Sequence, residues 1–531
     1  MRYALNADQM KRADDLTQKK YKVPSCVLME RAAYSVFEVI CERVDKAKGP
    51  VIIACGVGNN GGDGLALARM LFQEGYTVLP FMVGNIEKCS EECSRQLEIL
   101  KAYGIEVGTE VPGVVSVPGV PGVPGITLDI TPGGRSTDIA QVDITPSAVV
   151  DAIFGIGLSR EITGSYAEKI DALNALPGLK VAVDIPSGIS ADTGAVLRTA
   201  FEADITVTFG FAKTGHLVCP GRVYSGELII AQIGIDLNSL DEDVTYTSFP
   251  IKSDLSRIPR RIPDSNKGTY GRVLSVTGSK NMAGAALFVS KSAYMMGAGL
   301  VCIFTPEDNR VIMQTGIPEA VLISYDSDSA RTRSKLESAV DTATVIAAGS
   351  GLSMSGDAAE ILKTILSYGQ APLVLDADGL NLVASSEELS HLLTWYPGRK
   401  VLTPHVKEAA RLLRSDVENI KKDLIESAKA ISAEYRCECV LKDSASVAAL
   451  SDGRIIINAS GNNSMAKGGS GDVLTGIIAG LISTGAKPSD AAWLGMYIHG
   501  LAGEEASRVR GTRSVLATDI IDGISEVLKD A

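Results

Sequence analysis

A glycine-rich stretch at residues 461–476 (GNNSMAKGGSGDVLTG) combines residue types that bind an anion with one that accepts a proton. Gly468, Gly469 and Gly471 remove side chains from the loop, so several backbone N–H groups can converge on a phosphate where a helix is expected to begin. Asp472 follows in the first turn of that helix, where its carboxylate would repel a phosphate unless it faces another group, such as a substrate hydroxyl to be deprotonated. The alternative is a plain glycine-rich turn with Asp472 as helix cap.

Three polar segments of the first half each follow an apolar run that is typical of a strand: residues 59–64, 151–161 and 184–188. Ligand crevices of open α/β sheets lie at the carboxyl ends of parallel strands, so the coincidence of three such segments indicates one site. The alternative is that Asp63 and Asp184 cap helices while the glycines turn the chain.

Oxygen-bearing side chains in these segments could also hold a hard cation. Asn60, Asp151 and Ser187, together with backbone carbonyls, offer the ligands that a monovalent or divalent ion of this kind takes.

In the second half, five further segments follow expected strands: residues 278–284, 349–352, 376–381, 403–411 and 442–446. They combine backbones suited to phosphate with carboxylates suited to Mg²⁺ or proton transfer. For His405 alone, a buried and hydrogen-bonded imidazole is the usual role. Its place after a strand, close before Glu408 and Arg411, favours a ligand-facing role instead.

The elements that must position these residues alternate between strands and helices in both halves. This pattern predicts two α/β domains, the first doubly wound around a parallel sheet. The segment at residues 237–267 is polar and contains prolines, which predicts a linker. We therefore place the domains at residues 1–243 and 244–531. The Val-Pro-Gly repeats at residues 111–125 predict a loop without chemistry.

The composition of the chain argues against several classes of function. A net charge of −12 over 531 residues argues against nucleic acid as the main partner. The start of the chain lacks the apolar core of a signal peptide, and no apolar run reaches the length that spans a bilayer, so we expect no membrane association and a cytoplasmic location. Nine scattered cysteines fit reduced thiols, and four unpaired histidines do not indicate a metal site.

Specific motifs resemble one enzyme family over nearly the whole chain. The first half, with GVGNNGGDG, DAIFGIG and VDIPSG, is similar to the epimerase domain of the NAD(P)H-hydrate repair enzymes. The second, with TPHVKEAAR and NSMAKGGSGDVLTG, resembles their ribokinase-like dehydratase domain. The resemblance implies an α/β fold with a Rossmann-like first domain and a ribokinase-like second domain.

The same resemblance implies two repairs of a nicotinamide cofactor to which water has added. The first domain would interconvert the R and S hydrates of NADH and NADPH (NADHX and NADPHX). The second would dehydrate the S form with ADP and Mg²⁺, yielding NAD(P)H, AMP and phosphate. These small molecules are the expected partners, and we expect a homo-oligomer.

The resemblance also assigns roles to residues. The expected catalytic residues are Asp184 and Asp472, and the expected K⁺ ligands are Asn60, Asp151 and Ser187. The hydrate is expected to contact Asn59, Asn60, Gly61, Gly62, Asp63, Gly155, Ile156, Gly157, Leu158, Ser159, Arg160 and Glu161 in the first domain. In the second it is expected to contact Ala285, Gly351, His405, Val406, Lys407, Glu408, Ala409, Ala410 and Arg411. The adenine nucleotide is expected to contact Lys442, Asp443, Ser444, Ala445, Ser446, Asn462, Asn463, Ser464, Met465, Ala466, Lys467, Gly468, Gly469, Ser470 and Gly471.

Two features depart from the family pattern: Ser464, where the loop often has glycine before the methionine, and the Val-Pro-Gly insertion. Two other interpretations stay open. A small-alcohol kinase with a ribokinase-like loop could be fused to a non-catalytic nucleotide-binding domain, although such a kinase has no need of the first-half motifs. Alternatively, the first half could be a binding module without catalysis.

Overall fold

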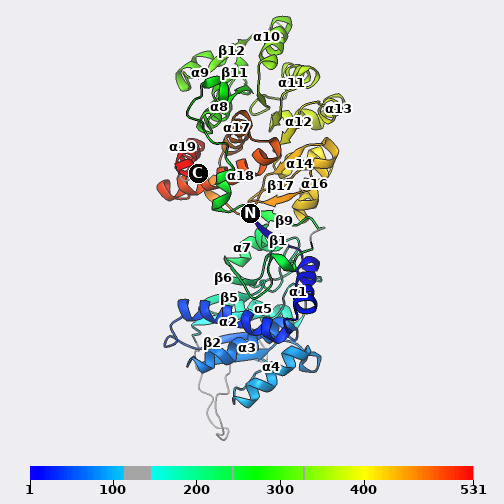
Figure 1. Ribbon diagram of the computed structural model, residues 1–531, viewed down its shortest axis with the longest axis vertical. Helices are drawn as coiled ribbons and strands as arrows, with labels where there is room; N and C mark the ends of the chain where they lie inside the picture. The colour runs from blue at the N-terminus through cyan, green and yellow to red at the C-terminus, as the bar shows by residue number, and fades with distance from the viewer. Residues whose placement is uncertain (113–144, 242–243, 327–328, 530–531) are drawn as a thin grey trace, which may run out of the picture. The chain divides into compact units, whose positions relative to one another are not determined.

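The computed structural model describes residues 1–112, 145–241, 244–326 and 329–529, which form two compact α/β units (Figure 1). One unit is Ala4–Val244, and the other is Thr245–Ala531 together with Met1–Tyr3. Most of the Val-Pro-Gly repeat region lies outside the described residues. Within the described residues, no helix is long and apolar enough to cross a membrane.

The first unit contains a six-stranded parallel sheet in the order β3-β2-β4-β5-β6-β8. Its strands are β2 (Val51–Cys55), β3 (Val78–Met82), β4 (Ala148–Ala152), β5 (Leu179–Val183), β6 (Ile205–Phe209) and β8 (Glu227–Ala231). The chain runs from β2 to one edge at β3 and returns to the other side of β2 at β4. The carboxyl ends of β2 and β4 therefore flank the switch point where open α/β sheets bind ligands.

Helices cover both faces of this sheet, as the doubly wound prediction requires. They are α2 (Ser25–Arg43), α3 (Asn59–Gln73) and α4 (Glu91–Ala102), which pack in sequence on one another, and α5 (Ser165–Ala175). Ile52 packs in one cluster with Ile170 and Leu173 of α5, whereas Ile53 of the same strand meets α3 at Gly64. Because successive strand residues point to opposite faces, α3 and α5 lie on opposite sides.

The glycine-rich segment after β2 is mostly helix, which differs from the turn expected there. Helix α3 already begins at Asn59, with Gly58 as its N-cap. A Cβ on Gly61 would lie 1.7 Å from the Gly56 carbonyl oxygen, so this glycine lets the helix start close against the strand end. The alternative in which Asp63 caps a helix is wrong, because Asp63 lies inside α3.

The second unit contains a sheet in the order β12-β11-β10-β13-β14-β15-β16-β17-β18-β9. Its strands are β9 (Thr247–Phe249), β10 (Arg272–Val276), β11 (Leu300–Pro306), β12 (Val321–Tyr325), β13 (Val345–Ala348), β14 (Leu373–Leu375), β15 (Lys400–Leu402), β16 (Glu438–Leu441), β17 (Val447–Ala449) and β18 (Ile455–Ile457). The pairings from β12 to β16 are parallel, and β17 pairs antiparallel with both neighbours. The order reverses between β10 and β13, which again places a switch point there.

The core of the second unit is built around the helix that follows the glycine loop. Helix α17 (Ser470–Ser483) packs on α8 (Ala283–Met295) and on α18 (Pro488–Arg510), which in turn packs on α19 (Ala517–Lys529). Figure 1 shows α17 among these helices. Val473, Leu474 and Ile477 are buried in this core, which fixes the start of α17 relative to the sheet.

Five strands of the structure were not predicted from the sequence. They are β1 (Arg2–Leu5), β7 (Ala212–Lys213), β9, β12 and β17. Part of the expected linker is ordered, because β9 adds to the sheet at Ser248, which pairs with Ile456. Helix α1 (Ala7–Tyr21) begins with a capping box, in which Asn6 and Gln9 bond each other.

Candidate active sites

Asp151, near the carboxyl end of β4, carries a fully buried carboxylate. It accepts hydrogen bonds from the N–H and the hydroxyl of Ser187, both at 2.7 Å, and from the Ile153 N–H at 3.1 Å. Burial raises the pKa of Asp151 to about 6, although these hydrogen bonds lower it. Among the described residues no basic side chain pairs with this carboxylate, so a cation placed beside it would be stabilised.

Asn60 lies on the facing helix and contacts the loop after β4. A Cβ on Gly155 would lie 3.5 Å from both the Cβ and the Cγ of Asn60. The Asn60 Nδ2 is buried and has no hydrogen-bond partner among the described residues. An unpaired buried amide costs free energy, and its presence beside Gly155 fits a site that a ligand completes. The rest of the expected segment is more open, with Gly157, Ser159, Arg160 and Glu161 exposed.

Asp184 follows β5 with φ of +69°, a conformation that a non-glycine residue rarely adopts. Its Oδ1 accepts hydrogen bonds from the buried Lys213 ammonium and, at 3.1 Å, from the Thr208 hydroxyl. The carboxylate is therefore held by an opposite charge. The alternative in which Asp184 caps a helix is wrong, because it precedes no helix and bonds to these side chains instead.

Two further groups surround the Asp184–Lys213 pair. The pKa of Asp63 is raised well above its usual range by burial and by the negative charges of Asp184 and Asp14. His216 is buried, its Nδ1 accepts the Lys213 N–H at 3.1 Å, and burial lowers its pKa to about 3. Asp184 thus forms a hydrogen-bonded ion pair with Lys213, while the raised pKa of the neighbouring Asp63 favours a proton on that carboxyl, so the two acids differ in their surroundings.

In the second unit, Asp472 lies in the first turn of α17, as predicted. The N-cap is Gly469 with φ of +90°, so the alternative in which Asp472 caps the helix is wrong. Burial and the negative charge of Asp376 raise the pKa of Asp472 to about 6, against the opposing effect of the nearby Lys442 ammonium. A carboxylate with this pKa can accept a proton near neutral pH.

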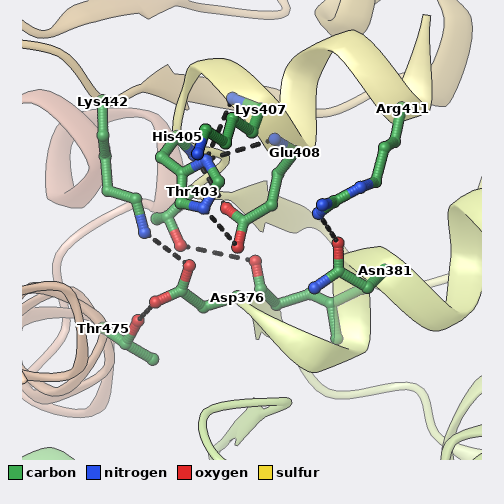
Figure 2. A network of polar contacts seen from close by, with 10 residues as sticks. Asp376, Asn381, Thr403, His405, Lys407, Glu408, Arg411, Lys442 and Thr475 are labelled. Atoms are coloured by element: carbon green, nitrogen blue, oxygen red, sulfur yellow. Dashed lines mark hydrogen bonds and ion pairs between the residues drawn. The ribbon is translucent and has the colours of Figure 1, made fainter. Parts of the chain in front are cut away.

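Figure 2 shows a polar network centred on the buried Asp376, whose charge acts on Asp472. One oxygen of Asp376 accepts a hydrogen bond from the Lys442 ammonium at 2.6 Å, and the other accepts one from the Thr475 hydroxyl at 2.9 Å. A Cβ on Gly471 would lie 3.2 Å from the Lys442 Nζ, so the ammonium lies against the glycine loop.

The expected residues Ala285 and Gly351 are neighbours at the switch point of this sheet. A Cβ on Gly351 would lie 2.8 Å from the Ala285 Cβ, and the φ of Gly351 is +62°. Both features require glycine at this position. The structure thus brings the start of α8 and the loop after β13 together.

His405 is neither a buried imidazole nor a residue with a wholly free ring. It is the N-cap of α14 (Val406–Leu412), and its Nδ1 accepts the N–H groups of Lys407 and Glu408 at 3.0 and 3.2 Å. Glu408 Oε2 accepts the His405 N–H at 2.8 Å, which completes a capping box. Burial raises the pKa of Glu408 to about 7.

Other members of this segment differ in accessibility. Val406, Ala409 and Ala410 are buried, whereas Lys407 is exposed. Arg411 donates to the Asn381 Oδ1 at 2.7 Å (Figure 2). A ligand can therefore reach this segment through its polar side chains more readily than through its alanines.

The glycine loop itself is mostly exposed before α17. Asn462 donates to the Ser507 hydroxyl at 2.9 Å, and Lys467 donates to the Arg513 carbonyl at 3.2 Å. The Ser464 hydroxyl is buried without a hydrogen-bond partner among the described residues. The loop members that are open to solvent are Asn462, Asn463, Ala466, Lys467 and Gly468, and Ser444 of the other nucleotide segment is also exposed.

Sequence reasoning did not single out Lys213, His216, Asp14 or Thr475. Lys213 follows β6 and lies in β7, which has two residues and gives no pattern of its own. Asp376 lies directly after β14, in the segment 376–381 that the sequence indicated, but sequence reasoning assigned it no role of its own.

Comparison with known proteins assigns both halves. Residues 25–215 match the family model described as "YjeF-related protein N-terminus", and residues 273–526 match the one described as "NAD(P)H-hydrate dehydratase". The chain is 36% identical to a bifunctional NAD(P)H-hydrate repair enzyme of Moorella thermoacetica, over 99% of this chain and 97% of that protein. It is 30% identical to the protein of the same name from Escherichia coli, over 94% and 89%. An ADP/ATP-dependent NAD(P)H-hydrate dehydratase from Bacillus subtilis, co-crystallised with ATP and Mg²⁺, is 30% identical over 53% of this chain and 98% of its own, with a TM-score of 0.47.

Proposed function

The chain belongs to the bifunctional NAD(P)H-hydrate repair enzymes, and on that premise we propose which residues carry out each repair step. We assign the epimerase to residues 1–243 and the dehydratase to residues 244–531. The observation that carries the proposal is Asp472, a half-buried carboxylate with a pKa of about 6 at the start of the helix behind the glycine loop.

In the first domain, the hydrate binds at the switch point between α3 and the loop after β4. Its contacts are Asn59 to Asp63 and Gly155 to Glu161, as the motifs of the family suggest. Asp184 contacts the reacting part of the nicotinamide ring. Lys213 and Thr208 hold the Asp184 carboxylate in position, while the raised pKa of Asp63 keeps a proton available to return.

A K⁺ ion is assigned to Asn60, Asp151 and Ser187. The buried Asp151 carboxylate, unpaired with any basic side chain among the described residues, supports a cation there. The three side chains offer only oxygen and amide groups, which suits a hard monovalent ion. When bound, K⁺ supplies fixed positive charge at the hydrate site, and Asp151 keeps Ser187 and the loop after β5 in place.

In the second domain, the hydrate lies near Ala285, Gly351 and the polar side chains of His405 to Arg411. ADP lies along residues 442–446 and 462–471, with its phosphates at the N-terminus of α17. Asp472 accepts the proton of the ring hydroxyl as the hydroxyl oxygen forms a bond to the terminal phosphorus of ADP, and AMP leaves. The ring nitrogen then donates its lone pair, the C–O bond to phosphate breaks, and loss of a ring proton restores NAD(P)H.

Mg²⁺ enters this site with the nucleotide and is held mainly by phosphate oxygens and water. Among the described residues no cluster of three or more acidic, histidine or cysteine side chains could hold a metal alone, but Asp376 and Asp378 place negative charge near Asp472, which would favour a divalent ion that arrives with the nucleotide. When bound, Mg²⁺ neutralises charge on the transferred phosphoryl group. Lys442 and the loop amides provide the protein's own share of that neutralisation.

The test of the dehydratase is incubation of the S hydrate with Mg²⁺ and either ADP or ATP. We expect the absorbance of the reduced nicotinamide to return with ADP. No return with either nucleotide contradicts the proposal. A stable phosphorylated alcohol as product favours the alternative of a small-alcohol kinase.

The test of the epimerase is the interconversion of pure R and S hydrates by the Asp184→Asn variant. We expect loss of the enzymatic rate, since Asn cannot accept a proton. An unchanged rate removes Asp184 from its role. We also propose that the enzyme is a cytoplasmic homo-oligomer, which size-exclusion chromatography with light scattering can check.

A further inference from the structure

The Asp376 carboxylate is positioned from several sides at the carboxyl end of β14. Its side chain is 1% exposed, and its two oxygens accept from different elements: Lys442 after β16 and Thr475 in α17. Its backbone is fixed as well, since its N–H donates to Ala348 and its carbonyl accepts the Gly379 N–H. Hydrogen bonds to both its side chain and its backbone therefore fix the position of the Asp376 carboxylate.

Lys442 connects this carboxylate to the glycine loop. Its ammonium bonds to Asp376 (Figure 2) and lies close to Gly471, where a Cβ would approach the Nζ to 3.2 Å and the Asp376 Oδ2 to 3.6 Å. A flexible lysine side chain loses conformational entropy when it binds a ligand. This entropy cost is smaller when a partner already holds the ammonium group in place. Asp376 therefore fixes the ammonium at the loop that is expected to hold the phosphates.

Other titratable groups face the same pair, from every element packed against it. Asp472 lies on α17, Asp378 on α12 (Asp378–Ser385), His405 and Glu408 at the start of α14, and His499 on α18. Loss of contact with water lowers the pKa of the half-buried His499 to about 4, so it contributes no charge near neutral pH. The positive charge of Lys442 thus acts on several carboxylates. Within the described residues, Asp376 alone accepts a hydrogen bond from its ammonium.

We propose that Asp376 is a positioning residue of the dehydratase: it holds Lys442 against the glycine loop and keeps a negative charge beside Asp472. The inference rests on the proposed function and adds that one carboxylate serves both parts of the site. Through Lys442 it determines nucleotide binding, and through its charge it strengthens Asp472 as a base.

The effects on Lys442 and on Asp472 predict two changes together, in the KM for ADP and in the pH profile, which loss of folding alone does not produce. In Asp376→Asn, the released Lys442 raises the KM for ADP about tenfold or more, as expected for a lost charge-assisted hydrogen bond. The loss of negative charge also makes Asp472 easier to ionise. The acid limb of the dehydratase kcat/KM profile therefore moves to lower pH, by about half a unit or more.

Three variants separate this role from others. Thr475→Val removes the neutral hydrogen bond to Asp376 and leaves its charge, so the acid limb stays at the wild-type pH. Lys442→Met removes the cation near Asp472 and moves the limb to higher pH, opposite to Asp376→Asn. In the double variant Asp376→Asn with Lys442→Met, the KM for ADP is that of Lys442→Met alone, because Asp376 acts on the nucleotide through Lys442.

The wild-type enzyme must first show ADP-dependent dehydration, and its absence would count against the proposed function and not against this inference. Given that activity, an unmoved acid limb or an unchanged KM in Asp376→Asn overturns the inference. Epimerase activity of the same preparations reports that the chain is intact. If Asp376→Asn does not fold, Asp376→Glu decides: it keeps the charge and moves its position, so the limb stays while the KM rises, and a wild-type KM overturns the inference.

Discussion

Removal of K⁺ should destabilise the first unit only at a pH where Asp151 is ionised. The pKa of Asp151 is raised from 3.8 to about 6 by burial, so the folded state binds a proton more tightly than the unfolded state. Without a cation, the protonated Asp151 therefore contributes its full stabilising free energy below about pH 4. This contribution is lost as the pH rises through about 6. A shift of about two pKa units corresponds to about 3 kcal/mol.

A cation that binds beside Asp151 can restore up to that free energy. We expect K⁺, compared with tetramethylammonium at equal ionic strength, to raise the unfolding temperature of the first unit at pH 7.5. For a unit of this size, each kcal/mol corresponds to about 2–4 °C. At about pH 4 the carboxyl is protonated, and the difference between the two cations should vanish.

The measurement is thermal unfolding followed by calorimetry in both salts across this pH range. Asp151→Asn is the matched control, because it keeps the size and hydrogen-bonding capacity of the side chain without the charge, and it should show no difference between the salts. A K⁺ effect of equal size at both pH values, or one that persists in Asp151→Asn, would refute the reasoning.

Three more predictions concern single residues. Lys213→Met leaves Asp184 buried without its cation, so the free energy of unfolding of the first unit should fall by about 3–5 kcal/mol in denaturant titrations; an unchanged midpoint contradicts the pairing. Because Asp472 must be ionised to act as a base, kcat/KM of the dehydratase should fall about tenfold per pH unit below about pH 6, and a flat profile between pH 5 and 7 rules out this base. Ser290→Ala should raise the unfolding temperature of the second unit, since the buried Ser290 hydroxyl has no partner among the described residues and its removal gains about 1 kcal/mol; a lower temperature indicates a missed partner.

The sequence was sufficient to predict the strands that carry the sites, because each is a buried apolar run followed by polar or glycine residues. Val51–Cys55, for example, is a wholly buried apolar run just before the glycine-rich segment, and it forms strand β2. The parallel order of these strands then brings their carboxyl ends to one edge, so the grouping of Asp151 with Ser187 follows from topology.

Other features depend on contacts that no local pattern encodes. The start of α3 at Asn59 depends on close packing of Gly61 on Gly56, which glycine spacing alone presents as a turn. Lys213 reaches Asp184 across 29 residues of chain, and Lys442 reaches Asp376 across 66. Such pairs arise from the tertiary fold, and a single sequence shows them only as isolated charged residues.

The capping role of His405 illustrates a third case. A histidine before a helix has no strong preference as N-cap, so its chemistry draws attention to ligand binding first. The structure shows that its Nδ1 is already used by two backbone N–H groups and that its Nε2 lies 3.3 Å from the Glu408 Oε1, so a ligand would meet this ring together with Glu408.

The most direct test of the account is recovery of reduced nicotinamide from an equal mixture of R and S hydrates, with ADP, Mg²⁺ and K⁺, followed by absorbance. The wild-type enzyme should restore the full absorbance in one rapid process. Asp184→Asn should rapidly restore only the S portion, and Asp472→Asn should restore none. Full rapid recovery by either variant, or no recovery by the wild-type enzyme, would contradict the assignment of two repair sites to this chain.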